Sequence, residues 1–326
     1  MPFRDESEPR RAAIDPFARF TELFAALDAE RGYFGDLAPL RLAAIALVTT
    51  PGDAVELAAQ VRARAAELAP HYSGWSISQS VRLVLAVILV RTGERVAEFV
   101  AANGRTQARM KAAKLGRGGV NELAAAMVLR RTVGREPDDD DVQRMRAIYA
   151  RLEHHHWFLT GADDLVACAL LAGREGTPEA IGDHVEAIYR QLAGAKKIWR
   201  GDSLLTAATV LGLLAFAPDE AATRFLAIAN ALRDRGVKLG TAEYDEVAML
   251  SFLPRSAELI AERVADMQRR LTEVLAWHED ASGIALAVDL AFFELAQAET
   301  DARVAVLADT KPLLDMQAIT WERSSS

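Results

Sequence analysis

The feature that most constrains this chain is an internal repeat of about 40 residues. The segment "AIYARL" from Ala147 returns as "AIYRQL" from Ala187 and as "AIANAL" from Ala227, each 40 residues after the previous copy. A fainter copy, "DMQRRL" from Asp266, follows 39 residues later. A fixed period of this length is typical of stacked units, because each unit needs its neighbours to bury its apolar face.

A second repeated block lies upstream of each of these segments. Its first apolar residues are spaced by 42, 40 and 42 positions at Leu123, Leu165, Leu205 and Val247. Similar steps lead back to Leu83 and Leu42 and forward to Leu286. The sequence therefore predicts six or seven units, with less regular units at the two ends, as expected where a repeat array is capped.

Prolines fall between the two blocks of several units, at Pro51, Pro137, Pro178, Pro218 and Pro254. Proline is favoured at the first position of a helix, where its missing N–H group is not needed. We interpret Thr50 and Thr177, which precede two of these prolines, as N-caps. Each unit is thus predicted to be an inner helix that is apolar nearly all round, a short turn, and an amphipathic outer helix.

The predicted fold is all-α, with tandem antiparallel helix hairpins of about 40 residues that form an α-solenoid or a closed α/α toroid. The composition agrees, since half of the residues are hydrophobic and only 7% are aromatic. The periodicity does not distinguish the open form from the closed one. We expect one continuous repeat domain over residues 16–320, with disordered tails at 1–15 and 321–326.

One segment also resembles a known family. "FLTGADDLVACALLA" (158–172), followed by "VEAIYRQL" (185–192), is similar to bacterial proteins that carry domain of unknown function 4003. Weaker echoes are "GDSLLTAATVLGLL" from Gly201 and "YDEVAMLSFL" from Tyr244. The resemblance implies a helical protein with no assigned activity, so it provides no catalytic residues.

The stretch "HHHWFLTGADDL" (154–165) lies between the outer helix of one unit and the inner helix of the next. Glycine precedes an aspartate at this connection and again at Gly201-Asp202. Glycine ends helices in the left-handed conformation, and Thr160 with Asp163 fits a capping box at the start of the next helix. We therefore interpret the stretch as a structural joint.

A metal site is the competing hypothesis for the same stretch. His154 or His156 would have to join Asp163 and Asp164 across the turn. Adjacent histidines point in different directions, and the chain has no His-Glu-x-x-His motif. We predict no metal here.

Acidic residues at the starts of the inner helices are the candidate binding residues. With the hydroxyl of the joint, the set is Thr160, Asp163, Asp164, Asp202 and Asp245. Carboxylates at helix N-termini complement the helix dipole, which explains them as caps. At the mouth of a toroid, the same carboxylates would suit acid/base hydrolysis of glycosides.

The segment 101–119 carries five basic residues and no acid: Arg105, Arg109, Lys111, Lys114 and Arg117. One interpretation is an anion-binding site. The other is a solvated helix face beside the acidic loop "EPDDDD" (136–141).

Charge and motifs narrow the classes of function. The net charge of −8 argues against a nucleic-acid partner. No apolar run is long enough for a membrane span, and the single cysteine, Cys168, fits a reducing cytoplasm and a buried position. No nucleotide-binding motif is present, and we expect no cofactor.

The leading hypothesis is a cytoplasmic protein-interaction scaffold with a protein or peptide partner. The alternative is a hydrolase or cyclase with carboxylates at the mouth of a toroid. The oligomeric state stays open.

Overall fold

The computed structural model describes residues 14–29, 37–72, 77–116, 118–156, 164–214, 216–275 and 281–297 of the 326. These residues form fourteen α-helices and no strand, which confirms the all-α prediction. No helix in the described ranges combines the length and apolarity needed to cross a membrane.

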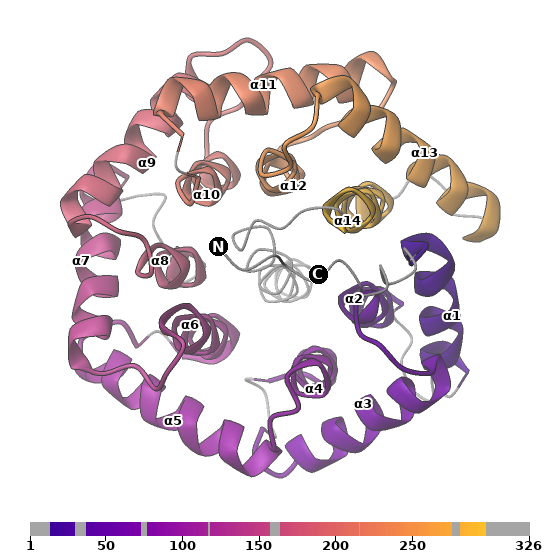
Figure 1. The fold of residues 1–326 in the computed structure, drawn as a ribbon. Coiled ribbons are helices and arrows are strands. Elements are labelled where there is room, and N and C mark those ends of the chain that lie inside the picture. The colour runs from indigo at the N-terminus through magenta and orange to yellow at the C-terminus, as the bar shows by residue number, and fades with distance from the viewer. Residues whose placement is uncertain are drawn as a thin grey trace, which may run out of the picture.

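The helices form two concentric rings (Figure 1). The outer ring consists of α1 (Pro16–Asp28), α3 (Ala54–Leu68), α5 (Val96–Ala112), α7 (Asp139–His155), α9 (Pro178–Ala193), α11 (Pro218–Asp234) and α13 (Ala257–Leu275). The inner ring consists of α2 (Ala38–Leu47), α4 (Gln79–Thr92), α6 (Gly119–Val133), α8 (Asp164–Leu171), α10 (Asp202–Leu211), α12 (Tyr244–Leu250) and α14 (Ala281–Ala296).

The last hairpin packs against the first, so the two ends of the array meet. Helix α14 contacts both α1 and α2. Arg270 of α13 pairs with Asp15 at 3.0 Å, and its guanidinium carbon lies 4.1 Å from the centre of the Phe17 ring. The side-chain amide of Gln297 hydrogen-bonds both backbone groups of Ile14, at 3.0 and 2.9 Å.

The rings differ in burial as the sequence predicts. Every residue of α8 is buried, because a neighbouring inner helix on each side and the outer ring enclose it. Each outer helix instead buries one stripe and exposes the opposite face. A fully buried Leu or Ile side chain contributes roughly 1.5–3 kcal/mol, so these stripes hold the rings together.

The outer helices end and the inner helices begin at one edge of the double ring, which we call the joint edge. The backbone N–H of Trp199, before α10, donates to the hydroxyl of Tyr244 at the start of α12 (3.0 Å). The opposite edge, where inner helices end, is the turn edge. There Arg174 Nη1, after α8, donates to Gly212 O at the end of α10 (2.5 Å).

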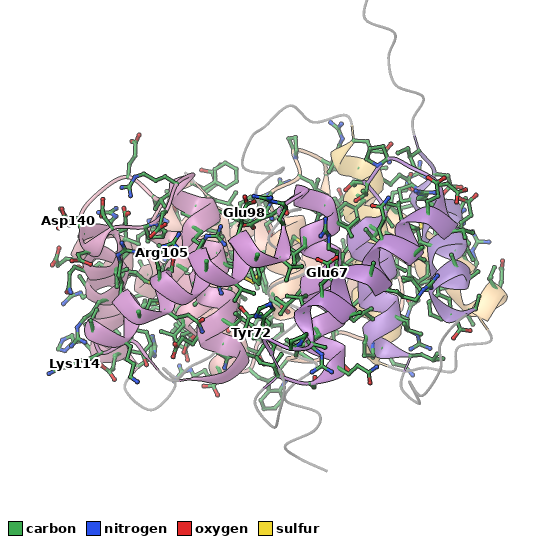
Figure 2. The ribbon with its side chains drawn as sticks, turned by 90° about the horizontal axis from the view of Figure 1, so that it is seen from below. Glu67, Tyr72, Glu98, Arg105, Lys114 and Asp140 are labelled. Carbon is green, nitrogen blue, oxygen red and sulfur yellow. The ribbon has the colours of Figure 1, made fainter. Side chains whose placement is uncertain are left out.

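The side view in Figure 2 separates the two edges. Asp140, at the start of α7, lies toward the turn edge, whereas Lys114, just after α5, lies at the joint edge. Charged side chains cover the outer ring between them.

One position of the outer helices is defined by the burial pattern. It is the residue directly before the buried stripe. The first and eighth residues after it are buried in all seven helices, and the fourth is buried in six, with Arg64 of α3 as the exception. In chain order the seven occupants are Arg19, Gln60, Ala102, Arg144, His184, Arg224 and Arg263. Their spacings of 39–42 residues equal the sequence repeat. We call this position the cap position.

Three of the four cap-position arginines, Arg19, Arg144 and Arg224, bind the chain that leaves the next inner helix, whereas Arg263 pairs with Glu294 within α14. Arg144 donates to Ala172 O at 2.8 Å and to Gly176 O at 2.9 Å, after α8. Arg224 donates to Ser251 O at 2.6 Å, after α12. A cation at a helix C-terminus satisfies carbonyls without helical partners and complements the dipole.

His184 shows a variation of this arrangement. Its Nε2 atom is buried without a hydrogen-bond partner among the described residues. Arg174 of the preceding turn instead donates to Gly212 O, at the end of α10. Burial, together with the nearby charge of Arg174, lowers the pKa of His184.

The proline prediction is confirmed in part. Pro178 and Pro218 are the first residues of α9 and α11, and Thr177 accepts from Ala180 N (3.2 Å) as its N-cap. The predicted N-cap at Thr50 is wrong. Asp53 caps α3 instead, because its carboxylate accepts from two backbone N–H groups of the first turn, at 2.9 and 3.1 Å.

Pro137 and Pro254 also lie outside their helices. Asp138 is the N-cap of α7 and forms a capping box with Asp141. Helix α13 begins at Ala257, three residues after Pro254. In both units proline belongs to the turn, and a later polar or small residue begins the helix.

Candidate functional site

Three of the five residues predicted from the sequence are described, and they stand at the joint edge. Thr160 and Asp163 lie outside the described residues. Asp164 is the first residue of α8 and is buried, whereas Asp202, the first of α10, is exposed. Asp245 is the second residue of α12 and is half-buried. Within the described ranges no three His, Cys, Asp or Glu side chains group closely enough to hold a metal ion.

Glutamates near the same helix starts bind the backbone. Glu122 Oε2 accepts from Gly118 N, and Glu243 Oε2 accepts from Gly240 N, both at 2.6 Å. Burial, followed by the nearby charge of Glu246, raises the pKa of Glu243. Glu122 thus binds the residue before α6, and Glu243 binds the loop before α12 rather than an N–H group of the helix.

The histidine stretch connects two outer helices. His155 Nε2 lies 3.1 Å from Asp183 Oδ1, and His156 Nε2 lies 2.5 Å from Glu186 Oε2. Both acids belong to α9, so the end of α7 is fixed to the next outer helix. Residues 157–163 of the predicted joint lie outside the described residues.

The basic segment pairs with the acidic loop after α6. Arg105 forms a two-pronged ion pair with Glu136, with Nε at 2.9 Å and Nη2 at 2.7 Å, and Arg109 Nη1 adds a third contact at 2.8 Å. Hydrogen bonds from these arginines lower the pKa of Glu136 to about 2. The solvated-face interpretation accounts for these two arginines.

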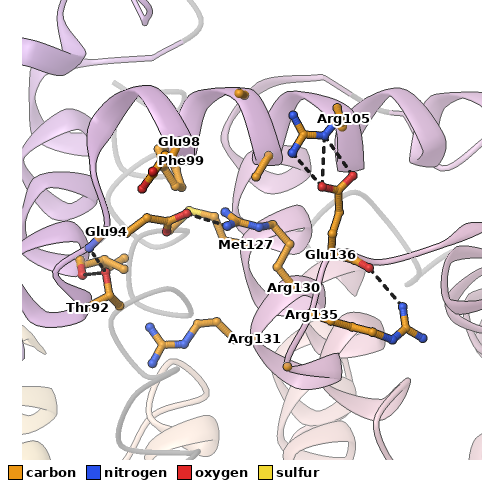
Figure 3. A pocket seen from close by; sticks show the side chains of 14 residues that line it. Thr92, Glu94, Glu98, Phe99, Arg105, Met127, Arg130, Arg131, Arg135 and Glu136 are labelled. Atoms are coloured by element: carbon orange, nitrogen blue, oxygen red, sulfur yellow. Dashed lines mark hydrogen bonds and ion pairs between the residues drawn. The ribbon is translucent and has the colours of Figure 1, made fainter.

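Beside this ion pair, a cavity of about 560 Å³ opens at the turn edge (Figure 3). We call it the arginine pocket. Its floor is apolar and contains Ile88, Phe99, Ala102 and Met127. Its charged lining consists of four arginines and three glutamates: Arg105, Arg130, Arg131, Arg135, Glu94, Glu98 and Glu136.

The pocket exists where the repeat departs from its pattern. The cap position of α5 is Ala102, so no long side chain extends from α5 beneath the end of α6. Conversely, Arg130 of α6 stands 42 residues before Ala172, the alanine at the same position after α8. The next unit has arginine (Arg144) on its outer helix and alanine (Ala172) after its inner helix. Here the outer helix has alanine (Ala102) and the inner helix has arginine (Arg130).

The exchange redirects a guanidinium group. Arg130 Nη2 pairs with Glu94 Oε1 at 2.6 Å, and the Arg130 guanidinium carbon lies 6.0 Å from the centre of the Phe99 ring. Figure 3 shows the Arg130–Glu94 and Arg105–Glu136 pairs on neighbouring walls of the pocket. Planar guanidinium groups bind carboxylate and phosphate oxygens through paired hydrogen bonds, so these walls suit an anionic group.

Sequence reasoning gave Arg105 as a candidate anion-binding residue but missed the cavity beside it. Its signal is the alanine at a position that holds arginine in four of the seven outer helices. The cap position becomes visible only when the buried stripes are aligned.

The single cysteine has no role in the pocket. Cys168 is buried in α8, and burial, with the nearby charge of Asp164, raises its pKa well above the ordinary value. A raised pKa keeps the thiol protonated and unreactive.

Comparison with known families gives one match. The family model of DUF4003, described as a protein of unknown function, matches residues 76–299, so the chain belongs to this family. The match includes the whole arginine pocket. No curated protein and no solved structure matches the chain.

Proposed function

Starting from a family with no assigned activity, we propose that this chain is a protein-interaction scaffold whose arginine pocket binds an acidic segment of a protein partner. The observation that carries the proposal is that Ala102 and Arg130 stand where the next unit has arginine and alanine, respectively. This arrangement leaves a cavity in a position that a structural arginine fills in other units, and it adds a guanidinium group to the wall.

The lining supports an acidic ligand. Arg105 and Arg109 already hold the carboxylate of Glu136 through three short hydrogen bonds. Glu136 is exposed at the rim, and its low pKa keeps it ionised. A partner's carboxylate would compete with Glu136 for the same guanidinium groups.

The floor supports an apolar side chain beside that carboxylate. Phe99 and Met127 are almost fully buried, and Ala102 leaves open space above them. Ligand cavities in proteins measure roughly 300–1,000 Å³, so this one has room for a few side chains of a peptide. We further propose a cytoplasmic location, which the single, buried cysteine supports.

Fluorescence anisotropy with a labelled, C-terminally amidated peptide that contains Glu-Leu-Glu tests the proposal. We expect Arg105→Gln to weaken binding about tenfold, by the loss of charge-assisted hydrogen bonds. Glu136→Gln should strengthen binding, because it removes the competing carboxylate. Arg64→Gln, at another outer-helix arginine paired with a glutamate, is the matched control and should leave affinity unchanged.

The Gln-Leu-Gln peptide should not bind. Equal affinity for both peptides, or an Arg105→Gln variant that binds like the wild type, would contradict the proposal.

The second candidate is a hydrolase or cyclase with carboxylates at the joint edge. One observation favours it: Glu243 and Glu246 are buried three residues apart, and the pKa of Glu243 is raised, as in a carboxyl group that keeps its proton for acid catalysis. Glycoside hydrolysis by the wild type that Glu246→Gln abolishes without lowering the melting temperature would favour this candidate over the scaffold.

A further inference from the structure

A second cavity, of about 580 Å³, lies at the joint edge, whereas the arginine pocket opens at the turn edge. It is formed by the end of α7, the last turns of α9 and the residues before α10. Its lining is His155, His156, Tyr189, Arg190, Ala193, Arg200 and Gly201.

We propose that this cavity binds a phosphate group, with Tyr189, Arg190 and Arg200 as the ligand-binding residues. Tyr189 is more than nine-tenths buried, and its ring packs edge-on against that of His156, with centres 4.3 Å apart. Tyr189 lines the cavity together with the two arginines, and its hydroxyl has no hydrogen-bond partner among the described residues. This free hydroxyl can donate a hydrogen bond to a ligand oxygen.

The charges of the cavity favour an anion. Arg200 forms no ion pair with the described part of the chain. Arg190 binds Glu186 through Nε, which leaves its terminal nitrogens to donate elsewhere. The carboxylates of Glu186 and Asp183 are already held by His156 and Arg190, and by His155 and Arg151.

The backbone adds donors on the same side. Gly201 lines the cavity and is the N-cap of α10, with φ 143°. The first N–H groups of a helix have no helical partner and carry partial positive charge. Two guanidinium groups, a hydroxyl and a helix start thus surround one cavity, which matches the donor set that phosphate oxygens require.

Thermal unfolding with increasing sodium phosphate, against sodium chloride at equal ionic strength, tests the proposal on the full chain. A ligand that binds only the folded state raises the melting temperature in proportion to its occupancy. We expect phosphate to stabilise the wild type more than chloride does. Arg200→Gln and Tyr189→Phe should each weaken the fitted affinity on the order of tenfold, the effect of one lost charge-assisted bond.

Two matched controls exist in the chain. Tyr149 is the residue 40 positions before Tyr189, in α7, and Arg235 ends α11 at the same edge one unit later. Tyr149→Phe and Arg235→Gln should respond to phosphate like the wild type. A phosphomonoester and sodium acetate separate the sources of the anion. Stabilisation by phosphate or the phosphomonoester supports the proposal; stabilisation by acetate alone, or an unchanged response in Arg200→Gln and Tyr189→Phe, overturns it.

Discussion

Arg144 and Ala102 occupy the cap position of successive outer helices, but only Arg144 reaches the end of the next inner helix. Arg144 donates to carbonyls on the chain that leaves α8, whereas Ala102 lies on the floor of a cavity beneath the end of α6. At the cap position, arginine thus makes a structural contact, and alanine leaves a candidate binding site.

Ala102→Arg should close the arginine pocket and abolish binding of the Glu-Leu-Glu peptide. The new side chain would meet Arg130, so the double variant Ala102→Arg/Arg130→Ala, which copies the pair Arg144/Ala172, should fold with a melting temperature near that of the wild type. Gln60→Arg, at the cap position of α3, is the control. The prediction is wrong if the double variant still binds the peptide with wild-type affinity.

Arg144→Met should lower the free energy of unfolding by about 1.5–3 kcal/mol, the usual cost of removing charged hydrogen bonds from partly buried carbonyls. Methionine keeps much of the apolar stem, so the loss reports the guanidinium contacts rather than packing. Urea unfolding measures it. Arg235→Met, at an exposed arginine that ends α11, should cost far less, and equal losses in the two variants would refute a capping role.

Glu243→Gln should stabilise the protein at pH 7. The pKa of Glu243 is raised above the ordinary 4.5, so its contribution to stability is present below pH 4.5 and is lost as the pH rises through the folded value. Glutamine cannot ionise, and its carbonyl still accepts from Gly240 N. The advantage of the variant in melting temperature should shrink toward pH 4.

The control for this pH dependence is Glu98→Gln. Arg95 lowers the pKa of the exposed Glu98, so this variant should show no gain at pH 7. A Glu243→Gln variant less stable than the wild type at pH 7 would show that the ionised carboxylate is required for its bond to Gly240 N.

Replacing Asp163 and Asp164 with alanine should cost stability, on the order of 1–2 kcal/mol, if they cap the start of α8. A chelator should change the melting temperature of neither protein. A chelator-dependent drop in the wild type that disappears in the double variant would instead support a metal site at the histidine joint.

The helical secondary structure could be predicted from the sequence alone. The 40-residue period, the apolar inner blocks and the 3.6-residue stripes of the outer blocks depend only on neighbours along the chain. Glycine and acid pairs also indicated where the inner helices begin. The exact helix starts differed at Thr50 because a nearby carboxylate is a stronger cap than a threonine hydroxyl in that turn.

The contacts between units and the meeting of the two ends arise only when the helices pack together. Arg270 and Asp15 are 255 residues apart, and their pairing depends on the small rotation added at each of the hairpins between them, which no local pattern records. The arginine pocket has the same origin. Ala102 is an ordinary helix residue in the sequence, and only packing against α6 turns its short side chain into a cavity.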